Sequence, residues 1–236
     1  MTDARLLKLI VEIRYADDIP EPFTFREKIL SSISSEQVKT PKNIIYGFGM
    51  LIKKKNIKIV VENNRAGADI VVSKSVSKSV QYATENIIKV FKLMSKSVGV
   101  KRIERIGVRG YWIKNTDDTS DTLISKFKKA FFNKNSLVNE SKDLNVILAF
   151  KDGDDKSLYN AAPLSKSELE KIINLNLKDY GHDNEEEITT NSAIYLDYDY
   201  FIEKKQTYND TLMVNFINQA IKKSKERLTK TFELLK

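Results

Sequence analysis

The chain has no cysteine among its 236 residues. This absence excludes disulfide bonds, thiolate nucleophiles, iron–sulfur clusters and zinc sites built on cysteine. It also fits a cytoplasmic protein, because disulfides belong to oxidising compartments. No stretch approaches the roughly 20 consecutive apolar residues that cross a bilayer, so we expect no membrane partner. The start of the chain has no small-residue cleavage site, so we expect no export either.

Histidine and glycine are also scarce. The single histidine, His182, stands in a polar segment and is interpreted as a surface residue, not as a general acid or base. The eight glycines form neither of the phosphate-binding motifs G-x-x-x-x-G-K-[ST] and G-x-G-x-x-G, and a G-x-S-x-G nucleophile elbow is missing too. The sequence therefore names no catalytic residue and no cofactor, and it favours a non-catalytic protein over an enzyme.

Lysine, in contrast, is abundant. The formal net charge is +8 and the isoelectric point is near 9.3, values that ordinarily point to a polyanionic partner. However, only eight of the 40 basic residues are arginine, and the lysines are spread along the chain. Non-specific attraction to phosphates needs a clustered stripe of charge. We therefore expect a protein or a small polar ligand as partner in preference to nucleic acid.

The hydrophobic pattern predicts an α+β fold. With 41% hydrophobic residues and a mean hydropathy of −0.39, the chain can bury a sizeable core. Apolar residues at alternate positions indicate strands, and a 3.6-residue period indicates helices. Capping boxes are read at Thr24 with Glu27 and at Thr207 with Asp210. Residues 169–177 fit either type of element, and strand is the prediction. The other predicted strands cover residues 6–15, 43–55, 57–61, 68–72, 101–113, 144–151, 158–162 and 193–202; a helix of about three turns follows residue 22, and further helices cover 79–97, 121–132 and 208–235.

The order of these elements indicates an internal duplication. Residues 1–100 read as β-α-β-β-β-α and residues 101–236 as β-α-β-β-β-β-α, so we predict one domain, 1–236, made of two pseudo-repeats. Matching Val11–Arg14 to Ile106–Arg109 places Arg14 and Arg109 at equivalent outward positions. The order is similar to that of the TATA-box-binding-protein-like and helix-grip folds. That similarity implies one curved antiparallel sheet backed by long helices.

Three segments resemble an uncharacterised, sporadically distributed bacterial protein family of about this length. They are Val11–Tyr15 in the first strand, Arg105–Arg109 in the strand that opens the second half, and Leu196–Asp199 before the terminal helix. They bracket nearly the whole chain, although 110–112 depart from the aromatic-then-asparagine continuation of that family. The resemblance implies the two-half architecture and an accessory or defence-associated gene product. It supplies no catalytic residue, because the family has no known activity.

The best candidate site is one face of the sheet. Strand alternation gathers on it a mixed set of charged and aromatic residues, which suits a protein, peptide or small polar ligand better than DNA. Arg14 or Arg109 can pair with the carboxylates of Asp197 and Asp199 there. The proposed binding residues are Arg14, Arg109, Tyr111, Asp197 and Asp199, with Glu12, Arg105 and Tyr195 on the same face.

Two alternative functions stay open at this point. Lysine-rich helix faces at 126–129 and 222–227 would serve a nucleic-acid-binding protein. Asp197 and Asp199, two positions apart on a strand, would serve a metal-dependent enzyme, although the simpler interpretation places them on the solvent side of a strand whose other face is buried. The C-terminal helix packs on the sheet in our interpretation, and it is also the candidate surface for a homo-oligomer.

Overall fold

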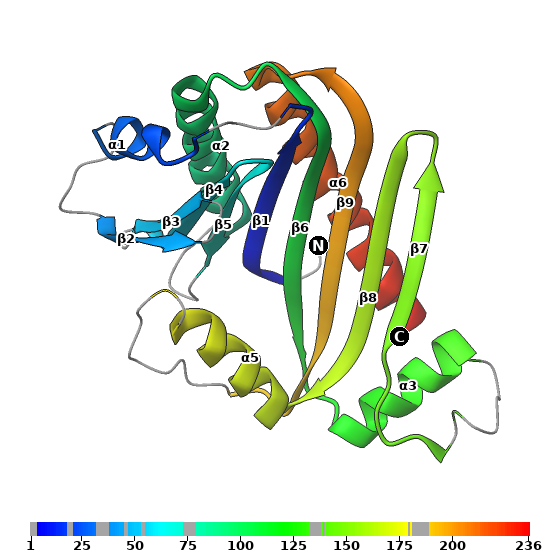
Figure 1. The fold of residues 1–236 in the computed structure, drawn as a ribbon. Helices are drawn as coiled ribbons and strands as arrows, with labels where there is room; N and C mark the ends of the chain where they lie inside the picture. The colour runs from blue at the N-terminus through cyan, green and yellow to red at the C-terminus, as the bar shows by residue number, and fades with distance from the viewer. Residues whose placement is uncertain are drawn as a thin grey trace.

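The computed structural model describes residues 4–17, 21–31, 38–44, 47–52, 55–72, 79–132, 138, 140–178, 180 and 189–236. In this part of the chain, nine strands form one antiparallel sheet in the order β2-β3-β4-β5-β1-β6-β9-β8-β7, with helices on both faces (Figure 1). The α+β class predicted from the sequence is confirmed. The strands are β1 (Arg5–Tyr15), β2 (Val38–Ile44), β3 (Gly47–Ile52), β4 (Ile57–Glu62), β5 (Arg65–Val71), β6 (Arg102–Thr116), β7 (Val146–Asp152), β8 (Asp155–Ser165) and β9 (Ser192–Thr207), and the helices are α1 (Thr24–Ser31), α2 (Ser79–Val98), α3 (Ser120–Phe132), α5 (Lys166–Lys178) and α6 (Asp210–Leu234).

Strands β1 and β6 lie side by side at the centre of the sheet, with Val11 opposite Val108. Moving outward, β5, β4, β3 and β2 follow on the β1 side, and β9, β8 and β7 follow on the β6 side. Along β1, buried residues alternate with more exposed ones, because successive side chains of a strand point to opposite faces. Register and alternation together decide which side chains share a face.

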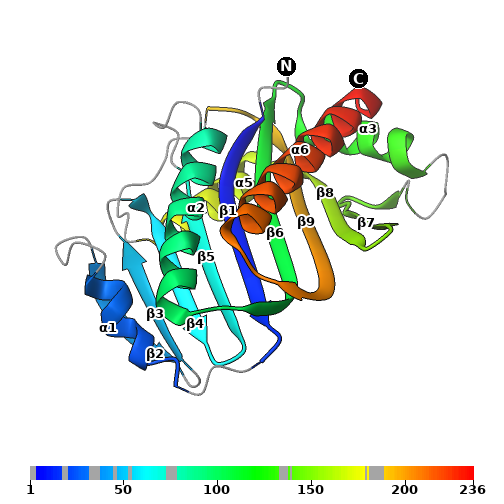
Figure 2. The same cartoon turned by 90° about the horizontal axis from the view of Figure 1, so that it is seen from above.

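Helices α2 and α6 cover one face of the sheet (Figure 2). Both are amphipathic, with apolar residues at helical spacing on the side that meets the strands. The apolar seam predicted for the C-terminal helix is buried here, so it is used within the chain and is not free to form a homo-oligomer. The buried seam residues of α6 include Met213, Ile217, Ala220, Ile221, Leu228 and Phe232.

Helix α5 packs on the opposite face, at one end of the sheet (Figures 1 and 2). The strand predicted for 169–177 is therefore wrong. Leu169 and Ile173, one helical turn apart, are buried in a separate apolar cluster with Ile113 and Ala193 of the sheet. A capping box that the sequence interpretation missed begins this helix: the backbone N–H of Ser165 donates to Glu168, and the backbone N–H of Glu168 reaches the Ser165 hydroxyl.

Other elements differ from the prediction at their boundaries. The single strand expected over 43–55 is two strands, β2 and β3, in which Asn43 pairs with Phe48. Alternation continues across this hairpin and so conceals it. Helix α6 has Asn209 as its N-cap, whose side chain accepts from the N–H of Leu212, in place of the predicted Thr207 box. At α1 the hydroxyl of Thr24 donates to the carbonyl of Glu21. The predicted extension of α1 beyond Ser31 lies outside the described residues.

None of the helices in the described ranges combines the length and the apolar content needed to cross a bilayer. The two longest, α2 and α6, carry charged residues along their solvent-facing sides.

Candidate functional site

The face of the sheet opposite α2 and α6 is here called the open face. It presents alternate residues of the four adjacent strands β5, β1, β6 and β9, and only its end near α5 is covered by a helix among the described elements (Figure 1). The register places all the sequence-predicted candidates on this face. They are Glu12, Arg14, Arg105, Arg109, Tyr111, Tyr195, Asp197 and Asp199.

Three arginines lie in a row across the open face. Arg14 stands directly opposite Arg65 on one side and opposite Arg105 on the other. Like charges opposed in this way repel one another. Glu12, two residues before Arg14 on the same strand, offsets the repulsion by pairing with Arg14 at 3.2 Å, Arg65 at 3.2 Å and Arg105 at 3.3 Å. Glu62 adds two hydrogen bonds to Arg65, at 2.7 and 2.9 Å.

Glycines on both sides of Glu12 make room for these contacts. Gly67 and Gly107 are its direct neighbours on the flanking strands, so no side chain stands beside the carboxylate on either side. A Cβ on Gly107 would lie 3.7 Å from the Nη2 atom of Arg105, so that guanidinium lies close over the glycine. The small residues thus let the arginines approach one carboxylate from two neighbouring strands.

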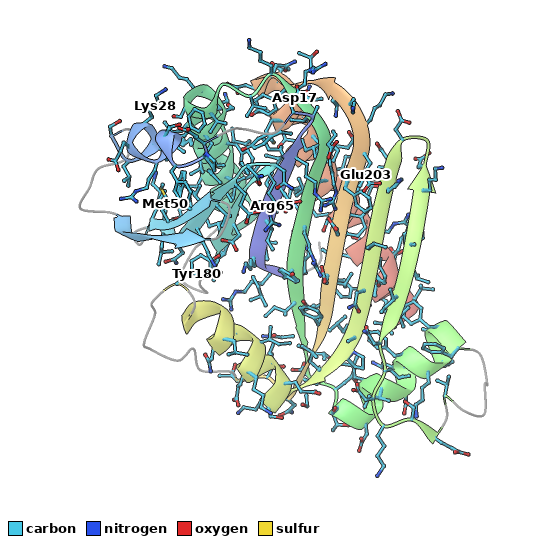
Figure 3. All side chains as sticks on the ribbon, viewed as in Figure 1. Asp17, Lys28, Met50, Arg65, Tyr180 and Glu203 are labelled. Carbon is cyan, nitrogen blue, oxygen red and sulfur yellow. The ribbon has the colours of Figure 1, made fainter. Side chains whose placement is uncertain are left out.

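Arg65 of β5 and Glu203 of β9, both labelled in Figure 3, belong to the strands that flank β1 and β6. Glu203 of β9 accepts a hydrogen bond from Lys156 at 2.7 Å and lies 4.0 Å from Arg105. Every arginine of the row therefore has a carboxylate nearby, and the face is close to charge balance.

Among the described ion pairs of the open face, the one between Arg109 and Asp197 contains the most buried carboxylate. Two hydrogen bonds, Nε to Oδ1 at 2.7 Å and Nη2 to Oδ2 at 2.5 Å, join them in a bidentate arrangement. The Asp197 side chain is 9% exposed and that of Arg109 is 45% exposed. The hydrogen bond to Asp197 raises the pKa of Arg109 despite the opposing effect of burial. One edge of the guanidinium is thus fixed in place while part of it still faces solvent.

Two tyrosines extend this pair toward α5. The guanidinium carbon of Arg109 lies 5.2 Å from the ring centroid of Tyr111, and that ring stacks on Tyr195 with 6.2 Å between centroids. Burial raises the pKa of both tyrosines, so both hydroxyls are neutral at physiological pH. Beyond them Lys8 lies 5.5 Å from the ring of Tyr180, labelled in Figure 3.

Asp199 differs from Asp197 although both lie on the open face of β9. Its nearest cation is Arg105, 3.6 Å away, and no hydrogen bond to it occurs within the described residues. Burial raises the pKa of Asp199, and the charges of Arg105 and Arg109 oppose this increase only in part. Asp197 is occupied by Arg109, whose positive charge would repel a cation placed between the two carboxylates. No group of three or more metal-ligating side chains occurs in the parts of the chain that the structure describes.

Two hollows flank the arginine row. One, of about 130 Å³, lies over Gly67 and is lined by Glu12 and Arg65. The other, of about 300 Å³, is lined by Arg14, Arg105 and Glu203. Neither includes Arg109, Tyr111, Asp197 or Asp199. Both hollows therefore border the arginine row, on the side of the site away from α5.

The sequence interpretation missed one of the three arginines of the row, Arg65. It placed Arg65 and Gly67 in the connection between the strands predicted for 57–61 and 68–72, whereas both belong to β5 and face the same way as Asp69. The alternation of Arg65, Gly67, Asp69 and Val71 was the available signal, and the short side chain of glycine obscured it. The predicted surface histidine, His182, lies outside the described residues.

The lysine-rich helix faces are partly occupied by contacts within the chain. This reduces the positive charge that they can offer to phosphates. Lys126 pairs with Asp118 at 2.8 Å, Lys128 donates to the Ser141 carbonyl, Lys223 lies 3.6 Å from Asp152, and Arg227 lies over the Phe150 ring.

These observations define the chain as an α+β protein whose antiparallel sheet is covered by two long helices on one face and carries an ordered, mixed-charge surface on the other. No protein family model and no curated protein matches this chain.

Proposed function

We propose that this protein is a non-catalytic binding protein that holds a protein, a peptide or a small polar ligand on the open face of its sheet. The observation that carries the proposal is that two guanidinium groups are both exposed to solvent and held in place by carboxylates. Arg14 and Arg109 are each 45% exposed, yet each is held by a carboxylate of the same face. A guanidinium has five donors in a fixed fork, so donors remain for a ligand after these contacts are made. Pre-ordered side chains also lower the entropic cost of binding.

The chemistry of the open face favours a partner with both carboxylate and aromatic or apolar groups. Carboxylates match the planar fork of arginine. The stacked pair Tyr111 and Tyr195 offers flat apolar surface beside Arg109. Glu12, Asp197 and Asp199 would repel a polyphosphate backbone placed on the same surface.

Affinity capture with matched variants tests the proposal. The tagged protein is incubated with a lysate of its source cells, and bound proteins, small molecules and nucleic acids are each identified by mass spectrometry or nuclease digestion. We expect a ligand that wild type retains and that Arg14→Ala and Tyr111→Ala lose. Lys222→Ala, an exposed change on α6 away from the open face, is the control and should retain it.

The same experiment separates the two alternative functions. A nuclease-sensitive ligand that is lost with Lys222→Ala and kept by Arg14→Ala would overturn the proposal in favour of nucleic-acid binding by the helix faces. A metal-dependent enzyme at Asp197 and Asp199 requires that Mg²⁺ or Mn²⁺ raise the thermal stability of wild type and not of Asp199→Asn, because a ligand that binds only the native state stabilises it.

We also propose that the chain arose by duplication of a half like residues 1–100, followed by divergence in 101–236. The strand order supports this, since each half begins with a central strand, β1 or β6, and its last strand, β5 or β9, pairs beside it. Each half ends in a long helix, α2 or α6, on the same face (Figure 2). Arg14 and Arg109 both face outward on the two central strands. The helix α5, inserted between β8 and β9, is the main departure of the second half.

A further inference from the structure

Strand β7 forms one edge of the sheet and exposes apolar side chains on both of its faces. Ile147 is 66% exposed on the open face. Leu158 of the neighbouring strand β8 is 47% exposed on the same face, where it stands opposite Ala149, two residues after Ile147. Leu148 is 41% exposed on the helix face. An edge strand also presents unpaired N–H and C=O groups, which form a ready template for another strand.

The opposite edge of the sheet has a different composition. Strand β2 contains Pro41 and two lysines within seven residues. Proline and lysine are the residues by which natural edge strands avoid pairing with other chains. Strand β7 has none of them over its first five residues, Val-Ile-Leu-Ala-Phe, and its charges, Lys151 and Asp152, stand together at one end. By composition, β7 is therefore better suited to pairing than β2.

We propose that β7 pairs with β7 of a second copy of this chain, in an antiparallel register centred on Leu148. A two-fold axis at Leu148 places Ile147 opposite Ala149 of the second copy and Val146 opposite Phe150. All five residues of the apolar run then face apolar partners, which is the arrangement that stabilises cross-strand pairs. Because the contact uses the same strand twice, the assembly closes as a dimer.

The distribution of charge selects this arrangement over others. In the antiparallel pair Lys151 stands opposite Asn145, and the two Lys151 side chains lie at opposite ends of the contact. A parallel, in-register pair would set Lys151 beside Lys151 and Asp152 beside Asp152, and like charges directly opposed are destabilising. Pairing of β7 with β2 would leave one free edge on each copy and would grow into a filament.

Sedimentation of the full chain tests the dimer. Wild type is examined at concentrations from about 1 µM to about 1 mM, the range in which weak to moderate association is measurable. We expect dimers at the upper end and a monomer for Ile147→Lys over the whole range. Leu175→Lys is the matched control, since Leu175 is 65% exposed on α5 and receives the same charge far from β7. A wild type that stays monomeric, or a dimer that survives Ile147→Lys, would overturn the proposal.

The register has its own test because the chain has no cysteine of its own. Single cysteines are introduced as Leu148→Cys and Lys151→Cys and are treated with a short thiol-specific cross-linker. Two residues at position 148 face each other about 5 Å apart across the axis. Two at position 151 lie six residues apart along the strands, roughly 20 Å. We expect covalent dimers for Leu148→Cys and not for Lys151→Cys. Equal yields at both positions, or none at either, would contradict the register.

Discussion

Arg14 and Arg109 are equally exposed, yet their carboxylate partners depend on them differently. Glu12 keeps Arg65 and Arg105 when Arg14 is removed, whereas Asp197 has no second arginine bound to it in the described chain. The loss of stability on removing one arginine therefore depends on which other cations its carboxylate partner can still contact.

We expect Arg109→Ala to lower the free energy of unfolding by about 1–3 kcal/mol, because it leaves a buried acceptor without its donors. Arg14→Ala should cost at most about 1 kcal/mol, as is usual for an exposed ion pair. Urea unfolding followed by the fluorescence of Trp112, the single tryptophan, measures both. If Arg14→Ala proved the more costly change, the assignment of Asp197 as the dependent carboxylate would be wrong.

The raised pKa of Asp199 predicts a pH-dependent effect of Asp199→Asn. A carboxyl with a folded-state pKa above its unfolded value, about 3.9, stabilises the fold below that value. This contribution is lost as the pH rises through the folded-state pKa. The asparagine variant has no such loss. Its stability relative to wild type should therefore increase between about pH 4 and neutral pH.

Urea unfolding of both proteins at several pH values measures that difference, in which all other titrating groups largely cancel. A relative stability of Asp199→Asn that falls as the pH rises would show that the charges of Arg105 and Arg109 outweigh burial at this position.

Among the elements, β6 is closely packed on its inner side, whereas the outer side of β5 has room for a further side-chain atom. On the inner side, a Cβ at Gly110 would lie 2.7 Å from the indole nitrogen of the buried Trp112. On the outer side of β5, which is separated from β6 by β1, a Cβ at Gly67 would meet only a backbone oxygen, at 3.5 Å, which is ordinary contact. These two glycines of the sheet thus have opposite tolerance for a side chain.

We predict that Gly110→Ala lowers the free energy of unfolding by about 1–3 kcal/mol, the usual cost of overfilling a packed core. It should also shift the emission of Trp112, whose environment must change. Gly67→Ala should change stability by no more than about 1 kcal/mol. The same urea titration compares the two, and a larger loss for Gly67→Ala would contradict the packing described for these strands.

For the whole molecule, elements could be predicted from the sequence wherever the signal was local. The alternation in β1, β6 and β9 and the helical period in α2 and α6 placed them within a few residues. The strand boundary at Gly47 and helix α5 were missed, because alternation runs through the β2–β3 hairpin and because Ile173 and Leu175 alternate within a helix. In both places pairing or packing with distant residues decides the outcome.

In the candidate site, too, features set by local pattern could be predicted, and features set by contacts between distant strands could not. Individual residues of β1, β6 and β9 could be assigned to one face from alternation alone, and the pairing of Arg109 with a carboxylate of β9 followed from that assignment. The convergence of three arginines on Glu12 could not be predicted, because it requires β5 to lie next to β1. Sequence pattern does not supply that neighbour, since β5 and β1 are more than 50 positions apart.

The order of the strands has a consequence for how the protein is made. Leu9 pairs with Gly110, about one hundred positions later, so one side of β1 stays an unpaired edge until β6 has left the ribosome. Strand β9 then inserts between β6 and β8. Before β9 is synthesised, the β7–β8 hairpin has no strand that connects it to the rest of the sheet. Assembly therefore depends on contacts between distant segments, a property of slowly folding chains, and a nascent chain that stops before residue 192 would hold two separate pieces of sheet.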